Sequence, residues 1–215
     1  MTEDSPRGSN PRSFPPLTLA PERAVLLGID FQQGFGPDGM EYTPGAPGAV
    51  AAFRRAAQTW REHGGHVIHV HSTREPEDFV AEDGRADDAA FTAHPMRRGS
   101  RHAEFYPGLV DDADTIIRKT AFSAVAGSNL TEVLRARGWT EVIVAGLTTP
   151  ICVGTTSDAL SMGGFLVGVL SDACASQPIG DYSAELMHDV ALARFGYLFG
   201  HTLTTAEFLN RVGPG

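Results

Sequence analysis

Short apolar runs alternate with helical patterns along this chain, and this alternation restricts its fold more than any other feature. Runs typical of buried strands occupy 24–29, 66–71, 115–118, a stretch that starts at 141, 165–170 and a short stretch near 197–203. Helical patterns follow at about 48–63, 129–137, 153–160, 183–195 and from 204 onward. We therefore predict an α/β protein with three α/β/α layers around a six-stranded, mainly parallel sheet.

Local signals predict where several of these helices begin or end. Asn129 with Glu132, and Thr204 with Glu207, have the spacing of a capping box at a helix N-terminus. Gly138 follows the helix that Asn129 would open, and glycine commonly ends helices.

Three polar or reactive side chains stand at the ends of predicted strands. Asp30 follows the run 24–29, Lys119 follows 115–118, and Cys152 lies just beyond the run that starts at 141. The carboxyl ends of parallel strands share one edge of the sheet, where ligands bind, so the three can converge. Taken singly, each has a plainer interpretation: Asp30 as a loop cap, Lys119 as a solvated charge and Cys152 as a small buried hydrophobe.

Cys152 is also expected at the N-terminus of the helical run 153–160. The positive end of the helix dipole and the unpaired backbone N–H groups there favour a thiolate and can hold an oxyanion. The position therefore suits a nucleophile.

Four motifs of this chain resemble those of the isochorismatase-like cysteine hydrolases, which include nicotinamidases, N-carbamoylsarcosine amidohydrolase, ureidoacrylate amidohydrolases and biuret hydrolase. They are 27–32 (LGIDFQ), 118–123 (RKTAFS), 146–153 (GLTTPICV) and 171–175 (SDACA), and the likeness extends from about 24 to 209. The resemblance implies an isochorismatase-like, Rossmann-like fold with strand order 3-2-1-4-5-6. It also implies a homo-oligomer, a dimer or a tetramer.

The resemblance further implies an Asp-Lys-Cys triad at Asp30, Lys119 and Cys152. In that chemistry the carboxylate takes the thiol proton, the thiolate attacks a carbonyl carbon, and the ammonium stabilises both anions before water releases the acyl group. The family also places a cis peptide bond between Leu147 and Thr148. The backbone N–H groups of Thr148 and Cys152 would then form an oxyanion hole.

Composition excludes some classes of partner. The formal net charge is −9 and the isoelectric point is near 5.3, whereas nucleic-acid binding needs a basic surface. No apolar run reaches the roughly 18 residues of a membrane span, and residues 1–8 have no apolar signal core. The chain has two cysteines, and a reducing cytoplasm is the expected location. The second, Cys174, is expected to be a structural thiol, with a resolving role as the alternative.

Two stretches lack a regular pattern. Residues 1–21 are rich in Pro, Ser, Arg and Gly, which predicts a flexible tail or an arm that crosses to another subunit. Residues 22–215 would form one hydrolase domain. Within it, 72–114 carries many charges and begins at the predicted active edge, so it is interpreted as a lid or substrate-specific insertion, or as a solvated loop.

No metal or other cofactor is expected. His69 and His71 share one face of their strand, because side chains alternate along a strand, and form a possible metal pair. Nicotinamidases place an Asp-x-His metal motif just after the corresponding strand, whereas 73–76 of this chain reads TREP. Nicotinamidase activity is therefore disfavoured.

Four residues are predicted to contact the substrate. Phe35 and Phe122 follow the triad candidates and would be pocket walls, or else anchors for their loops. Arg74 would hold a substrate carboxylate or ureido oxygen, or else be solvated. Gln32 would bond to Lys119 or to the substrate. Specificity would come from residues 31–47 and 72–114, the second of which also offers Glu104 and Phe105.

Together these observations predict a hydrolase that cleaves a C–N bond of a small amide, carbamoyl or ureido substrate through an acyl-enzyme at Cys152. The alternative within the fold is vinyl ether hydrolysis of the isochorismatase kind, in which Asp30 protonates an enol ether and no thiol is needed. A noncatalytic binding or assembly role is the third interpretation, because a fold does not determine a function.

Overall fold

A parallel sheet forms the centre of the computed structural model, which describes residues 13–81 and 84–213. Its strands lie in the order β3-β2-β1-β4-β5-β6, and each neighbouring pair is parallel. Their bounds are β1 Ala24–Ile29, β2 His66–His71, β3 Thr115–Arg118, β4 Glu141–Leu147, β5 Leu166–Ala175 and β6 His201–Leu203. The predicted fold class and the strand order implied by the resemblance are confirmed.

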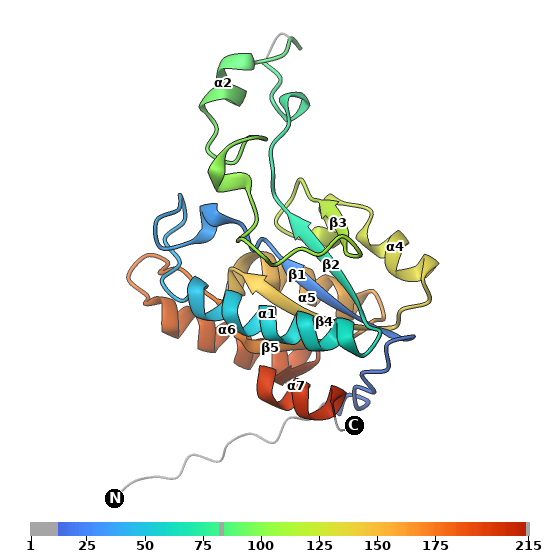
Figure 1. Cartoon of the computed structure of the whole chain (residues 1–215). Helices are drawn as coiled ribbons and strands as arrows, with labels where there is room; N and C mark the ends of the chain where they lie inside the picture. Colours follow the sequence, from blue (N-terminus) through green and yellow to red (C-terminus); the bar gives the residue numbers. More distant parts are fainter. Residues whose placement is uncertain (1–12, 82–83, 214–215) are drawn as a thin grey trace, which may run out of the picture.

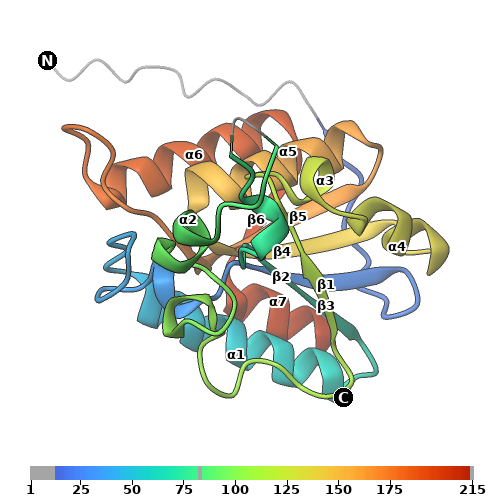
Figure 2. The ribbon, with the colours of Figure 1, turned by 90° about the horizontal axis from the view of Figure 1, so that it is seen from above.

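Helices cover both faces of this sheet, as Figure 2 shows. One face carries α1 (Ala46–Glu62) and α7 (Thr205–Val212), whose Trp60 and Phe208 are buried in one apolar core. The other carries α3 (Ala124–Gly127), α4 (Leu130–Ala136), α5 (Gly154–Met162) and α6 (Ala184–Leu198), with Leu160 and Phe195 in a second core. Successive residues of β1 join opposite cores, because side chains alternate along a strand.

Most predicted element bounds agree with the structure, and three local predictions are wrong. The strand expected at 165–170 continues to Ala175, because the pairing of β4 with β5 resumes after a register shift and includes Cys174. The short strand expected near 197–203 begins only at His201, since α6 continues to Leu198 and the N–H of Phe199 still donates to Phe195. The capping box at Thr204 is confirmed. The one expected at Asn129 does not form, because Ser128 Oγ accepts the N–H at the start of α4 instead.

The segment before β1 packs against the sheet where it is described. Leu17 and Leu19 are buried in the core that contains α1. The carboxylate of Glu141, at the start of β4, accepts bonds from Thr18 N at 2.9 Å, Thr18 Oγ1 at 2.6 Å and Leu19 N at 3.1 Å. Residues 1–12 of the predicted tail or arm lie outside the described residues.

The connection from β2 to β3 rises away from the body of the protein, as Figure 1 shows. This segment, residues 72–114, is called the β2–β3 arm below, and it contains the one-turn helices η2 (Pro76–Asp78) and η3 (Arg101–Ala103) and the short helix α2 (Asp88–Ala93). At its base the side chain of Asp114 accepts hydrogen bonds from Arg61 of α1 and His69 of β2. None of the helices in the described residues has the length and hydropathy needed to cross a membrane.

Candidate active site

The structure brings Asp30, Lys119 and Cys152 together at the carboxyl edge of the sheet. Lys119 Nζ lies 3.0 Å from Asp30 Oδ2 and 3.4 Å from Cys152 Sγ. The three residues are 0%, 2% and 5% exposed. Backbone bonds fix two of them to β2, since Asp30 N donates to Val70 O and Lys119 N to His71 O. The ammonium therefore lies between a carboxylate and a thiol in a nearly water-free site.

A second layer of residues holds Asp30. Ser72 Oγ donates to Asp30 Oδ1 at 2.8 Å, and Ser72 N donates to Gln32 Oε1, also at 2.8 Å. Gln32 Nε2 in turn donates to Ala103 O at 2.7 Å and to Thr73 Oγ1 at 3.2 Å. Both ends of the fully buried Gln32 amide are thus engaged by the β2–β3 arm. Asp30 itself has a left-handed φ of 52°, which is unusual for a residue other than glycine and common at functional sites.

Burial controls the proton affinities at this site. Burial raises the pKa of the Asp30 carboxyl, against the opposing charge of Lys119. Burial, followed by the charge of Asp30, raises the pKa of the Cys152 thiol to about 12, although Lys119 favours the thiolate. Desolvation therefore acts against the thiolate that a position near a helix N-terminus is expected to favour. The raised pKa keeps the Cys152 thiol protonated near neutral pH.

Backbone hydrogen bonds hold the turn that carries Cys152. It is a π-helical turn, Thr149–Val153, which precedes α5. The N–H groups of Ile151 and Val153 both donate to Thr148 O at 3.2 Å, and the Leu147–Thr148 peptide bond is cis. Gly146 has φ 149°, and a Cβ there would collide with the carbonyl oxygen of Ile29 in β1. Glycine therefore allows the strand that delivers Cys152 to approach the strand that delivers Asp30.

A cavity of about 300 Å³ opens above Cys152. Three of the four predicted substrate contacts, Phe35, Arg74 and Phe122, line it, whereas Gln32 does not. The other lining residues come from the loop after β1, the β2–β3 arm and the end of β3: Met40, Glu41, Ser72, His94, Met96, Lys119, Thr120 and Ala121. Sequence reasoning missed Ser72 and His94. Ser72 directly follows β2, so the rule that identified Asp30 and Lys119 could have found it, whereas His94 lies within the β2–β3 arm and belongs to no motif. The cavity is large enough for a small substrate.

The two candidate metal ligands are bonded to other protein groups. His69 Nε2 lies 3.0 Å from Asp114 Oδ2, and His71 Nδ1 lies 2.7 Å from Thr73 Oγ1. Both rings also contact the edge or face of Phe105. Within the described residues, no group of three or more His, Cys, Asp or Glu side chains is arranged to hold a metal ion.

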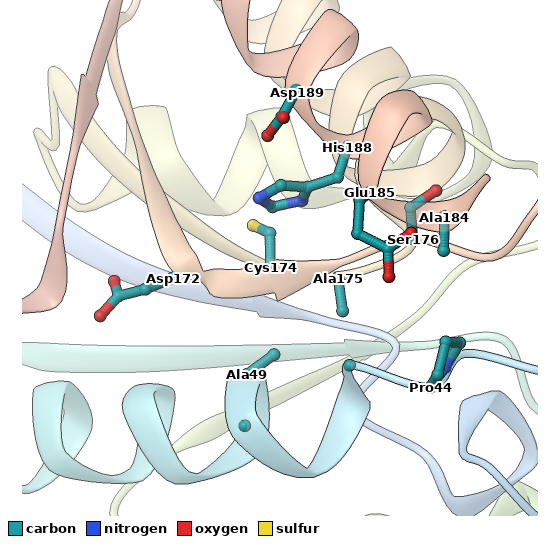
Figure 3. Close-up of a pocket in the computed structure, with 12 residues that line it drawn as sticks. Pro44, Ala49, Asp172, Cys174, Ala175, Ser176, Ala184, Glu185, His188 and Asp189 are labelled. Carbon is teal, nitrogen blue, oxygen red and sulfur yellow. The ribbon is translucent and has the colours of Figure 1, made fainter. Parts of the chain in front are cut away.

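A larger cavity of about 570 Å³ lies between the start of α1, the end of β5 and the start of α6. Figure 3 shows Cys174 and His188 directed into it. His188 Nδ1 is 2.8 Å from Thr149 Oγ1 in the turn that carries Cys152. Cys174 is a free, buried thiol whose pKa burial raises to about 12. We take the smaller cavity as the candidate active site, because it alone of the two is lined by triad residues.

Comparisons with known proteins bear on the family and the fold. A family model described as the isochorismatase domain matches residues 24–207. The isochorismatase family protein YrdC of Bacillus subtilis is 30% identical over 198 residues, which cover 88% of this chain and 96% of YrdC. The maleamate amidohydrolase of Pseudomonas putida is 28% identical, with 88% and 87% covered. The crystal structure of a cysteine hydrolase from Pseudomonas syringae pv. phaseolicola superposes with a TM-score of 0.80 at 26% identity, covering 94% of this chain and 98% of that one.

Proposed function

The chain belongs to the isochorismatase family, and from this premise we propose that it is a cysteine hydrolase acting on a C–N bond of a small amide, carbamoyl or ureido substrate. The observation that carries the proposal is the position of Lys119, 3.0 Å from the Asp30 carboxylate and 3.4 Å from the Cys152 sulfur. A buried ammonium shared by a base and a thiol is suited to a step in which negative charge moves from one to the other.

The reaction proceeds through a thioester. Asp30 takes the proton of Cys152 as the sulfur attacks the carbonyl carbon. The substrate oxygen gains negative charge in this step, and the N–H groups of Thr148 and Cys152 stabilise it. The protonated Asp30 then gives its proton to the departing nitrogen as the C–N bond breaks. Water, deprotonated by Asp30, attacks the thioester, and the sulfur regains a proton as the acid is released.

Substrate specificity is assigned to the residues that line the cavity. Phe35 and Phe122 provide apolar walls, and Arg74 provides a cation at the mouth. Gln32 supports Ser72 and through it Asp30. The expected cytoplasmic location belongs to the same proposal, since a catalytic thiol has to stay reduced. The expected homo-oligomeric state is part of the proposal too.

Vinyl ether hydrolysis is the second candidate, and one observation favours it. Burial raises the pKa of Asp30, which would help that carboxyl to keep a proton for delivery to an enol ether. Cys152 would then take no part in the reaction. The two candidates differ in what they require of the sulfur.

The test compares wild type with Cys152→Ala and Cys152→Ser. Ammonia release is measured on primary amides, N-carbamoyl amino acids, ureidoacrylate and biuret, and pyruvate release on isochorismate. Ammonia from the wild type that is lost in both variants supports the thiol mechanism. Pyruvate formed equally by all three proteins refutes it in favour of Asp30 chemistry, and turnover of nothing on the panel supports a binding or assembly role.

A further inference from the structure

The larger cavity of about 570 Å³ has the position and the size of a ligand site, although no triad residue lines it. It includes the carboxyl end of β5, at the edge of the parallel sheet where ligands bind. Pockets for small molecules typically have volumes of about 300–1,000 Å³. Gly48 of α1 lines the cavity, and a Cβ added there would have no neighbouring heavy atom within 4 Å among the described residues. The cavity therefore has room for a small organic molecule.

The side chains that carry a charge at neutral pH in this cavity are all acidic. Glu185 and Asp189 lie one turn apart on α6, and Asp172 lies in β5. No lysine or arginine of the described residues lines the cavity, and none forms an ion pair with these three carboxylates. Asp172 uses its Oδ1 to accept the N–H and the hydroxyl of Thr205. Carboxylates gathered around a cavity favour a positively charged ligand.

Two further side chains distinguish this cavity from a solvated acidic surface. Figure 3 shows that Cys174 of β5 and His188 of α6 are directed into it. Cys174 is a free thiol that is only 6% exposed. The N–H of Gly146 donates to its sulfur, but no group of the described residues accepts its S–H proton. A buried polar side chain without an acceptor is a feature that a bound ligand would explain.

His188 connects the cavity to the turn that carries Cys152. Its Nδ1 lies 2.8 Å from Oγ1 of Thr149, a buried residue that directly follows the cis peptide bond. Burial lowers the pKa of His188, against the opposing charge of Asp189, so the ring is neutral at pH 7. A neutral imidazole has one donor and one acceptor nitrogen. If Nε2 accepts a hydrogen bond from a ligand, the ring proton lies on Nδ1 and is donated to Thr149 Oγ1.

We propose that the larger cavity binds a small organic ammonium ion, whose charge is offset by the acidic side chains and whose N–H donates to His188 Nε2. The apolar part of the ion would lie against Ala49 and Ala175, which line the same cavity. Bound in this way, the ion fixes the Nδ1–H tautomer of His188 and so determines the direction of the hydrogen bond to Thr149. This inference goes beyond the proposed function, and its tests measure binding without turnover.

The first test uses benzylamine, which is a cation at pH 7, and its neutral match benzyl alcohol. In titrations followed by NMR, the wild type is expected to bind benzylamine about tenfold more tightly, the combined effect of several exposed charge pairs. The preference should disappear in Glu185→Gln/Asp189→Asn. Asp181→Asn removes an exposed carboxylate that precedes α6 outside the cavity, and it should keep the preference.

Three outcomes of these titrations overturn the proposal. The first is equal binding of benzylamine and benzyl alcohol, and the second is tighter binding of benzoate. The third is a preference that disappears in Glu41→Gln, because Glu41 lines the candidate active site and not the larger cavity.

Two substitutions of Gly48 test the location of the bound ion. Gly48→Ala adds only a Cβ and should keep benzylamine binding, whereas Gly48→Leu fills the cavity and should abolish it. Circular dichroism checks that both variants fold. Binding that is unchanged in Gly48→Leu overturns the proposal. A wild type that binds no benzylamine, together with a Gly48→Leu oligomer that dissociates in light scattering, overturns it in favour of a second copy of the chain as the occupant.

A third test concerns His188. In the complex with benzylamine, the ¹⁵N signals of its ring should be those of the Nδ1–H tautomer, and the backbone N–H signals of Ile151 and Val153 in the turn should move. His188→Phe keeps an aromatic ring without an acceptor, so binding should weaken by about fivefold and the signals of the turn should stay in place. A ring whose Nδ1 is unprotonated in the complex overturns the proposed contact.

Discussion

Replacing Asp114 by alanine is expected to destabilise the protein more than any surface substitution on the β2–β3 arm. Asp114 ends the arm just before β3, and its side chain is 2% exposed. Oδ2 lies 2.5 Å from Arg61 Nη2, 3.0 Å from His69 Nε2 and 2.8 Å from Asp111 N, while Oδ1 accepts from Arg61 Nε at 3.0 Å. One carboxylate therefore joins α1, β2 and the base of the arm.

The magnitude follows from what the substitution leaves behind. His69 is 0% exposed and its Nε2 would lose the carboxylate it bonds to. Arg61, which is 25% exposed, would lose the same carboxylate. Breaking one side of a buried ion pair costs about 3–5 kcal/mol, and the partial exposure of Arg61 favours the lower end, about 3 kcal/mol. That is a large fraction of the roughly 5–15 kcal/mol that stabilises a typical domain.

The stabilisation by Asp114 should depend on pH in a defined direction. Burial opposes ionisation of Asp114, but hydrogen bonds from His69 and Arg61 outweigh it and hold the pKa below the ordinary 3.8. A lowered carboxyl pKa contributes stability that is present above 3.8 and is lost as the pH falls below it. The free energy of unfolding of Asp114→Ala should therefore fall below that of the wild type by its full amount at pH 7. This difference in stability should become smaller below pH 3.8.

Urea denaturation followed by circular dichroism measures both effects. Asp112→Ala is the control, since it removes an exposed carboxylate two residues away. The reasoning fails if Asp114→Ala loses less than about 1 kcal/mol at pH 7, the scale of an exposed ion pair. It also fails if the difference persists unchanged at pH 3.

Three further predictions concern the site and its surroundings. Burial raises the pKa of Cys152 to about 12, so its alkylation by iodoacetamide should be slow at pH 7 and become faster up to pH 10. Mass spectrometry measures the rate, with Cys152→Ala as the control. A fast rate that does not change above pH 7 would contradict this prediction. The pKa of His71 is lowered from 6.5 to about 4 by burial and by the charges of Arg118 and Lys119, so its contribution to stability should be lost as the pH falls from 6.5 toward 4. The urea midpoint of His71→Gln should therefore change less between pH 7.5 and pH 5 than that of the wild type. Parallel pH profiles for the two proteins would refute this prediction. Gly146→Ala should cost about 1–3 kcal/mol or more, because of the backbone angle and the collision with Ile29, and an unchanged melting temperature would show that the strands relax.

The sequence was sufficient to find Asp30, Lys119 and Cys152 because the relevant geometry is a property of the whole sheet. Every parallel strand ends at the same edge, so a reactive residue just after an apolar run is placed there whatever the intervening loops do. Bounds of β1, β2 and β3 could be predicted to the residue for the same reason, since apolar runs in a buried sheet end sharply at charged or polar residues.

The proton affinity of Cys152 could not be predicted in this way. The local sequence shows the start of a helix, which contributes a favourable effect of about 0.3–1 kcal/mol on an exposed charge. It does not show that the sulfur is 5% exposed and lies beside a buried carboxylate. Desolvation depends on the packing of distant segments, and here it has the larger effect.

Charge pairing on the β2–β3 arm shows how such distant packing determines which charges line the candidate active site. Arg74 and Asp78 are four residues apart, the spacing at which opposite charges pair on an α-helix. The chain instead forms the one-turn helix η2, in which Asp78 accepts from Glu75 N and turns its carboxylate to Arg118 of β3. Glu75 then pairs with Arg98 across the arm. Arg74 lines the cavity while Glu75 and Asp78 pair with other arginines, so the charge at this wall depends on the path of the arm rather than on any motif around residue 74.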